Sequence, residues 1–144
     1  MGTRALVHFY DNETELACIY RQYDGYPTGL GDELAELLKP FTVVNGLSPS
    51  SEGKIANGPG CLAAQIIAAL KDRPGNVYLY PPGISDVGEE YVYKVRAKGG
   101  EILFECLRPS GKVKYSGPPK DFVGSELELA PTPRTLTGGG AFWV

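Results

Sequence analysis

Apolar and polar residues alternate along six short stretches of the chain, a pattern typical of β-strands. In residues 4–10 apolar groups fall on both sides of the strand, and residues 11–13 supply turn chemistry before the alternation resumes at residue 15. We therefore expect an opening β-hairpin that lies inside the sheet. The six predicted strands cover residues 4–10, 15–21, 76–80, 89–97, 101–107 and 112–115.

Two further stretches have helical periodicity. Leu30, Leu34 and Leu38 recur at helical spacing and predict an amphipathic helix over residues 31–39. Residues 59–71 are apolar almost all round, with Gln65 as the lone interior polar group. A helix that is apolar on every side is buried, so we expect this one to be the central packing helix. The segment between the helices, residues 41–57, predicts irregular structure.

These elements predict an α+β fold, a mostly antiparallel sheet of about six strands with two helices packed on it. A chain of 144 residues has the length of one domain. We expect residues 1–116 to form a single α+β domain. Proline and glycine become frequent after that point, which predicts a C-terminal extension over residues 117–144, with a short strand at residues 126–129.

Charge and cysteine content narrow the class of protein. The formal net charge is −3 and the pI is near 5.2, which argues against a general nucleic-acid binder. Cys18, Cys61 and Cys106 are far apart, which argues against a disulfide framework or a zinc site and favours a reducing compartment. No signal-peptide pattern opens the sequence and no apolar stretch approaches membrane-spanning length. We expect a cytoplasmic protein without membrane association.

The turn between the second strand and the first helix is rich in chemistry. Its sequence, YRQYDGYPTGLG, contains glycines that allow close approach of a ligand, and the second helix begins with N–H groups that favour anions. Guanidinium groups would meet negative charge, tyrosine rings would stack, and amides or a carboxylate would recognise polar edges. The candidate ligand-binding residues are Arg4, Arg21, Gln22, Tyr23, Asp24, Tyr26, Asn57 and Gln65. The competing interpretation is that Asp24, Gly25 and Pro27 simply build a turn.

Catalytic groups do not form a coherent set in the sequence. Cys61 lies near a helix start, where a thiol becomes more acidic, but a nucleophilic cysteine needs a histidine and His8 lies in a distant strand. Glu89 and Glu90 are adjacent on a predicted strand and therefore face opposite sides. We expect no catalytic residue, no metal ligand and no cofactor. A hydrolase or transferase built on Cys61, Glu89 or Asp24 is the third-ranked interpretation.

The last predicted strand and the C-terminal end of the chain suggest different roles. Lys112 and Lys114 alternate with apolar residues, and we interpret them as protection of an edge strand. Three glycines precede the hydrophobic end, Phe142, Trp143 and Val144. This end packs either on its own sheet or on a neighbouring subunit, and exchange between subunits would produce a homo-oligomer.

Several short motifs resemble a family of small uncharacterised phage and bacterial proteins with a Q-[YF]-D-G-Y-P turn and an N-G-x-G-C-L-A-A-Q helix start. The motifs are GTR (2–4), YRQYDGYPTG (20–29), NGPGCLAAQ (57–65), YLYPP (78–82) and EEYVY (89–93). The resemblance covers roughly the first 95 residues. It implies that the turn and the start of the second helix belong together, and a phage setting implies capture of a host signalling nucleotide or a structural role.

We therefore expect a non-enzymatic protein that binds a small ligand. In a viral setting, it would sequester a nucleotide-like signal in the host cytosol. The alternative is a viral structural or assembly protein whose tail makes subunit contacts. The expected partners are a small molecule and other copies of the chain.

Overall fold

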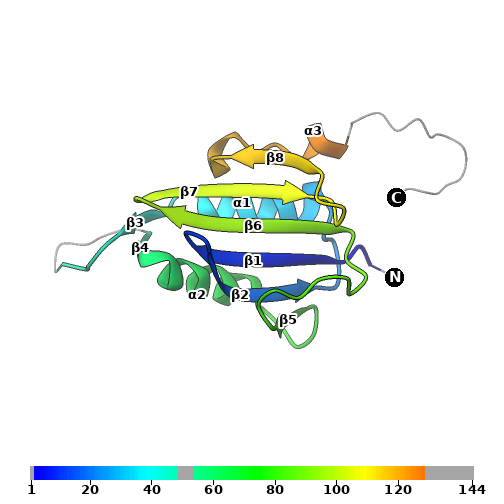
Figure 1. Ribbon diagram of the computed structural model, residues 1–144, viewed down its shortest axis with the longest axis horizontal. Coiled ribbons are helices and arrows are strands. Elements are labelled where there is room, and N and C mark those ends of the chain that lie inside the picture. Colours follow the sequence, from blue (N-terminus) through cyan, green and yellow to red (C-terminus); the bar gives the residue numbers. More distant parts are fainter. Residues whose placement is uncertain (1, 49–53, 129–144) are drawn as a thin grey trace, which may run out of the picture.

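The computed structural model describes residues 2–48 and 54–128. Its main element is a six-stranded sheet with the strand order β5-β2-β1-β6-β7-β8 (Figure 1). A second sheet pairs two short strands, β3 and β4. The strands are β1 (Ala5–Asp11), β2 (Thr14–Arg21), β3 (Thr42–Val44), β4 (Ile55–Asn57), β5 (Val77–Tyr80), β6 (Tyr91–Lys98), β7 (Glu101–Leu107) and β8 (Val113–Gly117).

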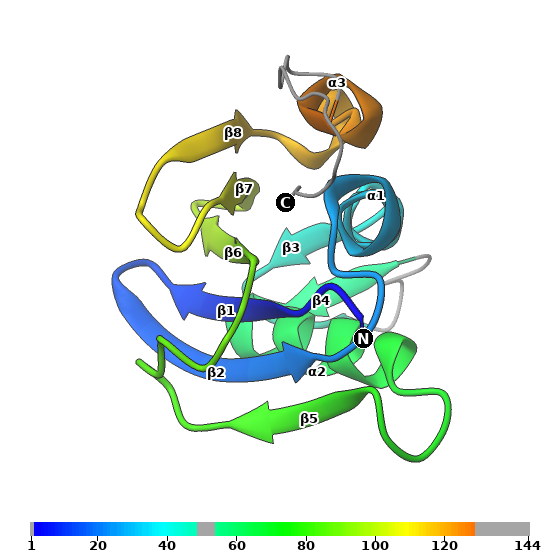
Figure 2. The same ribbon diagram turned by 90° about the vertical axis from the view of Figure 1, so that its right-hand side faces the viewer.

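Helices α1 (Asp32–Leu38) and α2 (Gly58–Leu70) both lie behind the large sheet in Figure 1. A π-helical turn, η1 (Pro27–Gly31), leads into α1. A 3-10 turn, η2 (Pro119–Asp121), and a short helix, α3 (Gly124–Glu128), follow β8. Figure 2 shows α3 beside α1 at the β8 end of the sheet. The predicted fold class, α+β with a mostly antiparallel sheet, is confirmed.

The opening hairpin lies inside the sheet, as its two-sided apolar pattern predicts, because β2 and β1 are flanked by β5 and β6. The β1–β6 pair is parallel, with Ala5 opposite Tyr91 and Phe9 opposite Val95, and is the exception to the antiparallel neighbours expected from the sequence. A parallel pair needs a long crossover connection. Here that connection contains α1 and α2, which cover one face of the sheet.

The core fills the space between the sheet and the helices. Tyr93 and Phe104 stack with ring centroids 6.0 Å apart, and the edge of Phe122 approaches Phe104 at 5.0 Å. Helix α2 buries Leu62 and Ile66 but exposes Ala64, Ala68 and Ala69. The prediction that α2 is buried all round is therefore wrong: it lies in a single helical layer, and alanine tolerates the solvent side because it has a high helix propensity.

Two other local predictions need correction. The segment 41–57, expected to be irregular, contains the parallel strands β3 and β4. The short strand expected at residues 126–129 is instead helix α3, up to Glu128. Within the predicted extension, Phe122 is only 5% exposed and belongs to the core. Residues 129–144, including the hydrophobic end, lie outside the described part of the chain. No helix among the described residues is long and apolar enough to cross a membrane.

Candidate functional site

The face of the sheet opposite the helices carries its own set of polar side chains. Along β1 the even-numbered residues face this side, including His8 and Tyr10. In register with His8 are Cys18 on β2 and Lys94 on β6. Two connections border this face, residues 81–90 between β5 and β6 and residues 108–112 between β7 and β8. Figure 1 shows the first of them passing in front of β2 and β1.

A cleft of about 250 Å³ lies on this uncovered face, between the two connections. Polar and apolar groups both line it. Strand residues supply one part and the connections supply the rest: His8, Tyr10, Glu15, Val92, Lys94 and Leu107 from the strands, and Gly83, Ile84, Ser85, Glu89, Arg108, Pro109 and Gly111 from the connections. The volume is slightly below the range of about 300–1,000 Å³ that is typical of small-molecule sites.

A β-bulge in β2 brings Glu15 to this cleft. The register runs regularly from Ala5 opposite Arg21 to Phe9 opposite Ala17, and then shifts so that Tyr10 is opposite Glu15. Leu16 is therefore an extra residue in the strand. In a regular strand residues 15 and 18 would face opposite sides. The bulge turns Glu15 to the same side as Cys18 and His8, as bulges near functional sites often do.

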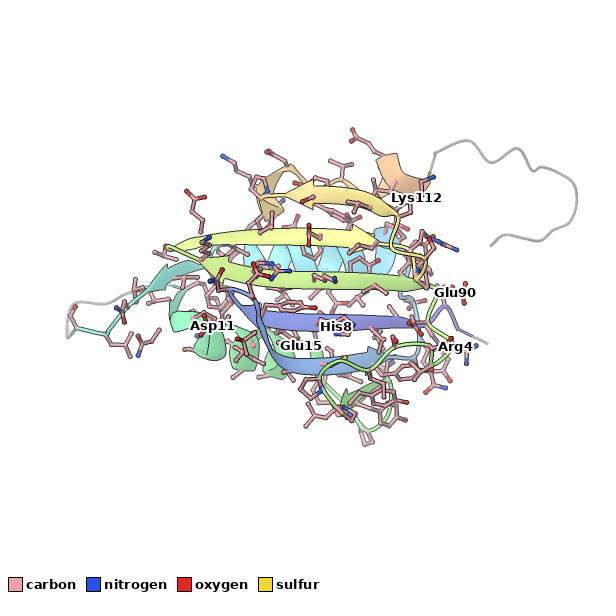
Figure 3. All side chains as sticks on the ribbon, in the orientation of Figure 1. Arg4, His8, Asp11, Glu15, Glu90 and Lys112 are labelled. Atoms are coloured by element: carbon pink, nitrogen blue, oxygen red, sulfur yellow. The ribbon has the colours of Figure 1, made fainter. Side chains whose placement is uncertain are left out.

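Glu15 and His8 form the most closely coupled polar pair in the cleft. His8 Nδ1 and Glu15 Oε2 are 2.5 Å apart, and the side chains are only 8% and 13% exposed. The other carboxylate oxygen of Glu15 accepts a hydrogen bond from the Gly83 N–H at 2.9 Å, which ties the 81–90 connection to β2. Figure 3 shows His8 and Glu15 side by side on the face turned away from the helices.

A second buried carboxylate belongs to the same connection. Glu89 accepts hydrogen bonds from the N–H groups of Asp86 at 3.1 Å and Val87 at 2.8 Å. The prediction from the sequence treated Glu89 and Glu90 as unable to act together. The structure gives Glu89 a defined orientation in the wall of the cleft, just before β6 begins.

Two cations line the cleft without an ion pair to another described residue: Lys94 and Arg108. Lys94 Nζ lies 5.8 Å from the centroid of the Tyr10 ring, and the Arg108 guanidinium lies 4.7 Å from that of Tyr91. Glu105, opposite Lys94 on β7, accepts a hydrogen bond from Ser116 instead. A cation–π contact does not occupy the N–H donors of the cation, so these donors can bind another partner.

Burial shapes the acidity of two groups on this face. It raises the pKa of the Cys18 thiol to about 12, with smaller contributions from the negative charges of Glu15 and Glu89. Burial also raises the pKa of the Tyr10 hydroxyl, with Glu15 adding to the effect. Cys18 is thus a protonated thiol at neutral pH and not an activated nucleophile.

The predicted turn residues are mostly engaged with the protein itself. Arg21 donates from Nε to the Tyr23 carbonyl at 2.8 Å and from Nη1 to Glu33 at 3.1 Å. The Tyr26 hydroxyl donates to Asp24 at 3.1 Å. The backbone N–H of Gln22 and that of Tyr23 both donate to Asn76, which follows α2. The Tyr23 ring is exposed.

The three remaining predicted residues are not part of the turn itself. Asn57 precedes α2 and accepts a hydrogen bond from the Gly46 N–H at 2.7 Å. Gln65 donates to the Ile55 carbonyl at 2.9 Å and also contacts the Cys61 sulfur at 3.3 Å. Arg4 lies where β6 begins, and its backbone oxygen accepts from the Glu90 N–H at 2.8 Å. Figure 3 shows Arg4 and Glu90 at the same end of the sheet.

The turn and the beginning of α2 do not meet. The turn follows the end of β2, whereas α2 begins beside β4 at the other end of the large sheet (Figure 1). Helix α2 has 13 residues and is therefore about 20 Å long. Asn76, in the segment that follows the C-terminus of α2, contacts the turn. Arg21, Gln22, Tyr23, Asp24 and Tyr26 are therefore close together. Arg4 lies at the same end of the sheet, between Thr3, whose carbonyl accepts from the Gly25 N–H, and Ala5, which pairs with Arg21. Asn57 and Gln65 are separate from the turn. Ligand binding by the eight residues stays a prediction.

The glycines of the turn permit contacts within the protein. A Cβ on Gly25 would lie 2.8 Å from the Thr3 carbonyl oxygen, and a Cβ on Gly29 would lie 2.4 Å from that of Asp24. Close backbone approach is thus required by the fold at these positions. This supports the competing interpretation that the DGYPTG segment builds a turn.

Sequence reasoning missed the cleft because its parts come from strands and connections far apart in the chain. Glu15 and Lys94 stand in ordinary alternating patterns, and Arg108 opens an ordinary Pro-Ser-Gly turn, so none gives a local signal of a site. His8 was compared with Cys61, yet its cross-strand neighbour is Cys18. In comparisons with known proteins, no family model, no curated protein and no solved structure matches this chain.

Proposed function

We propose that this protein binds a small anionic ligand of nucleotide-like chemistry in the cleft on the uncovered face of the sheet. The observation that carries the proposal is the pair of cations, Lys94 and Arg108, which line one cleft without an ion-pair partner among the described residues. Cations without an ion-pair partner can donate charge-assisted hydrogen bonds to an anionic group of a ligand.

The other groups in the cleft favour a ligand with more than an anion. Glu15 and Glu89 would repel a bare phosphate, but their carboxylates would accept hydrogen bonds from N–H or O–H groups of a ligand. Ile84, Val92 and Leu107 provide apolar contact area. A nucleotide-like molecule combines an anionic group, hydrogen-bond donors and a planar ring, so it fits this mixture better than inorganic phosphate does.

The size of the cleft also favours one small molecule. A cleft of about 250 Å³ matches the size of one small molecule, whereas protein and nucleic-acid partners bind over much larger surfaces. The resemblance to phage proteins suggests a biological role for such binding. In a viral setting, the protein would sequester a host signalling nucleotide. The alternative role in virus assembly concerns the C-terminal tail and stays a prediction.

The proposal is tested by calorimetric titration with a panel of nucleoside mono- and diphosphates, with inorganic phosphate as the reference, in a buffer that contains EDTA. At least one nucleotide should bind more tightly than phosphate. Lys94→Gln and Arg108→Gln should each weaken that binding about 10- to 100-fold, since a hydrogen bond to a charged group contributes about 1.5–3 kcal/mol.

Lys112→Gln is the matched control, because it removes a positive charge from the same β7–β8 connection without lining the cleft. It should leave the affinity within about twofold. Absence of binding across the panel, or equal losses in all three variants, would contradict the proposal.

A further inference from the structure

Three chemically different donors converge at the inner side of the cleft: the His8 imidazole, the Glu15 carboxylate and the Cys18 thiol. One ligand atom from each lies within 4.8 Å of the other two. His8 and Cys18 are direct cross-strand partners, and the bulge at Leu16 supplies the third donor. We propose that His8, Glu15 and Cys18 form a binding site for a divalent transition-metal ion of the zinc class.

The donor spacing is close to that of a tetrahedral centre. Zinc holds nitrogen and oxygen ligands near 2.0–2.2 Å and sulfur near 2.3 Å, which places neighbouring donors about 3.3–3.7 Å apart. Side-chain shifts on the order of 1 Å would bring the three atoms from their present separations to that geometry. The 2.5 Å contact between His8 Nδ1 and Glu15 Oε2 would open, with the ion taking the place of the shared proton.

The nature of the donors selects the metal. A thiolate and an imidazole favour zinc-class ions, and a single carboxylate is too few oxygen ligands for Ca²⁺ or Mg²⁺. With a neutral imidazole, the carboxylate and the thiolate carry two negative charges, which one divalent ion neutralises. As the metal enters, the imidazole changes tautomer so that its proton is carried by Nε2 and Nδ1 is free to bind, and the Cys18 proton is released to solvent. No oxidant or reductant takes part.

The surroundings of the cluster resemble those of a supported site. Glu15 Oε1 is held by the Gly83 N–H at 2.9 Å, which leaves Oε2 on the side of His8. Such outer hydrogen bonds orient metal ligands. Among the described residues, the Cys18 sulfur has one long hydrogen-bond contact, 4.0 Å, with the Ile19 carbonyl. His8 and Glu15 line the cleft, so a fourth coordination position would face it and remain open to water or a ligand.

This inference does not depend on nucleotide binding, and the metal alone tests it. Full-length protein, purified with EDTA and kept reduced, is titrated with Co²⁺ as a spectroscopic substitute for Zn²⁺. We expect one equivalent to produce visible ligand-field bands and a near-ultraviolet thiolate-to-cobalt charge-transfer band, both abolished by stoichiometric Zn²⁺. Zn²⁺ should also raise the melting temperature.

Cysteine variants assign the sulfur ligand. Cys18→Ser should abolish the charge-transfer band, while Cys106→Ser should retain it. Cys106 is the matched control because it is also a buried strand cysteine, but belongs to the core on the helical side of the sheet. Glu15→Gln and His8→Gln should each weaken Co²⁺ binding by roughly tenfold or more, and they keep the test decisive if Cys18→Ser does not fold.

Three results would overturn the inference. The first is no spectral change and no thermal shift of the wild-type protein at micromolar metal. The second is a charge-transfer band that survives in Cys18→Ser or disappears in Cys106→Ser. The third is unchanged affinity in both Glu15→Gln and His8→Gln. Because the nucleotide titrations contain EDTA and the metal titrations contain no nucleotide, failure of one proposal leaves the other standing.

Discussion

The hydroxyl of Tyr93 connects the sheet to the glycine-rich turn, and its removal should destabilise the protein measurably. Tyr93 is fully buried, and its hydroxyl donates to the Gly25 carbonyl at 2.7 Å. Tyr93→Phe keeps the ring and its stacking on Phe104, so packing is conserved. The substitution removes the hydrogen bond and leaves the buried Gly25 carbonyl without that donor. Together these effects should lower the free energy of unfolding by about 1–3 kcal/mol.

The assay is urea unfolding followed by circular dichroism, with the free energy of unfolding extrapolated to water. Tyr78→Phe is the control, because the Tyr78 side chain is 43% exposed and its ring contact with Lys71 survives the change. The control should lie within about 0.5 kcal/mol of the wild-type protein. A Tyr93→Phe loss no larger than the control's would refute the view that this bond holds the turn on the sheet.

Three further predictions concern backbone fit, thiol access and pH. Gly29→Ala should destabilise the protein by about 1–3 kcal/mol in the same assay, because the added Cβ would lie 2.4 Å from the Asp24 carbonyl oxygen. Gly60→Ala, in helix α2, is the control. The Cβ added there would meet no atom within 4 Å outside its own helix backbone and chain neighbours, so this change should be neutral or stabilising. If the two alanines behave alike, the close approach at Gly29 is not needed. Iodoacetamide at pH 8 should modify the half-buried Cys61 of the native protein and should modify Cys18 and Cys106 only after denaturant is added. Mass spectrometry measures the labelling of each cysteine. Labelling of Cys18 in the native protein would contradict its burial. Burial raises the pKa of the Cys18 thiol from 9.0 to about 12. The protonated thiol therefore contributes to stability fully below about pH 9, and this contribution is lost as the pH rises toward 12. The fall in unfolding free energy at alkaline pH should accordingly be shallower in Cys18→Ala. An unchanged slope would count against that shift.

Local patterns were enough to predict most helices and strands, because the periodicity of each element depends only on the residues within it. The alternation in the two opening strands and the leucine spacing around Leu34 required no knowledge of distant partners. The error at α2 had a similar origin. Eight apolar residues, four of them alanine, suggested burial on all sides, and only the single helical layer of the fold decides which alanines face solvent.

The cleft depends on information that no local pattern contains. Glu15 faces His8 only because one extra residue, Leu16, shifts the register of β2. Lys94 reaches the same face through the parallel pairing of β6 with β1, which joins residues more than eighty positions apart. The sequence-predicted pocket assumed instead that two glycine-containing motifs meet, and the direction of α2 separates them.

The most direct test of the proposed site is mapping of amide chemical-shift changes by NMR with the tightest-binding nucleotide of the panel at saturation. The account predicts that the largest changes fall on residues 83–89, on the β6 residues around Lys94 and on residues 108–111. Changes concentrated instead on residues 21–26, or an absence of changes at the cleft, would contradict it and direct attention back to the turn after β2.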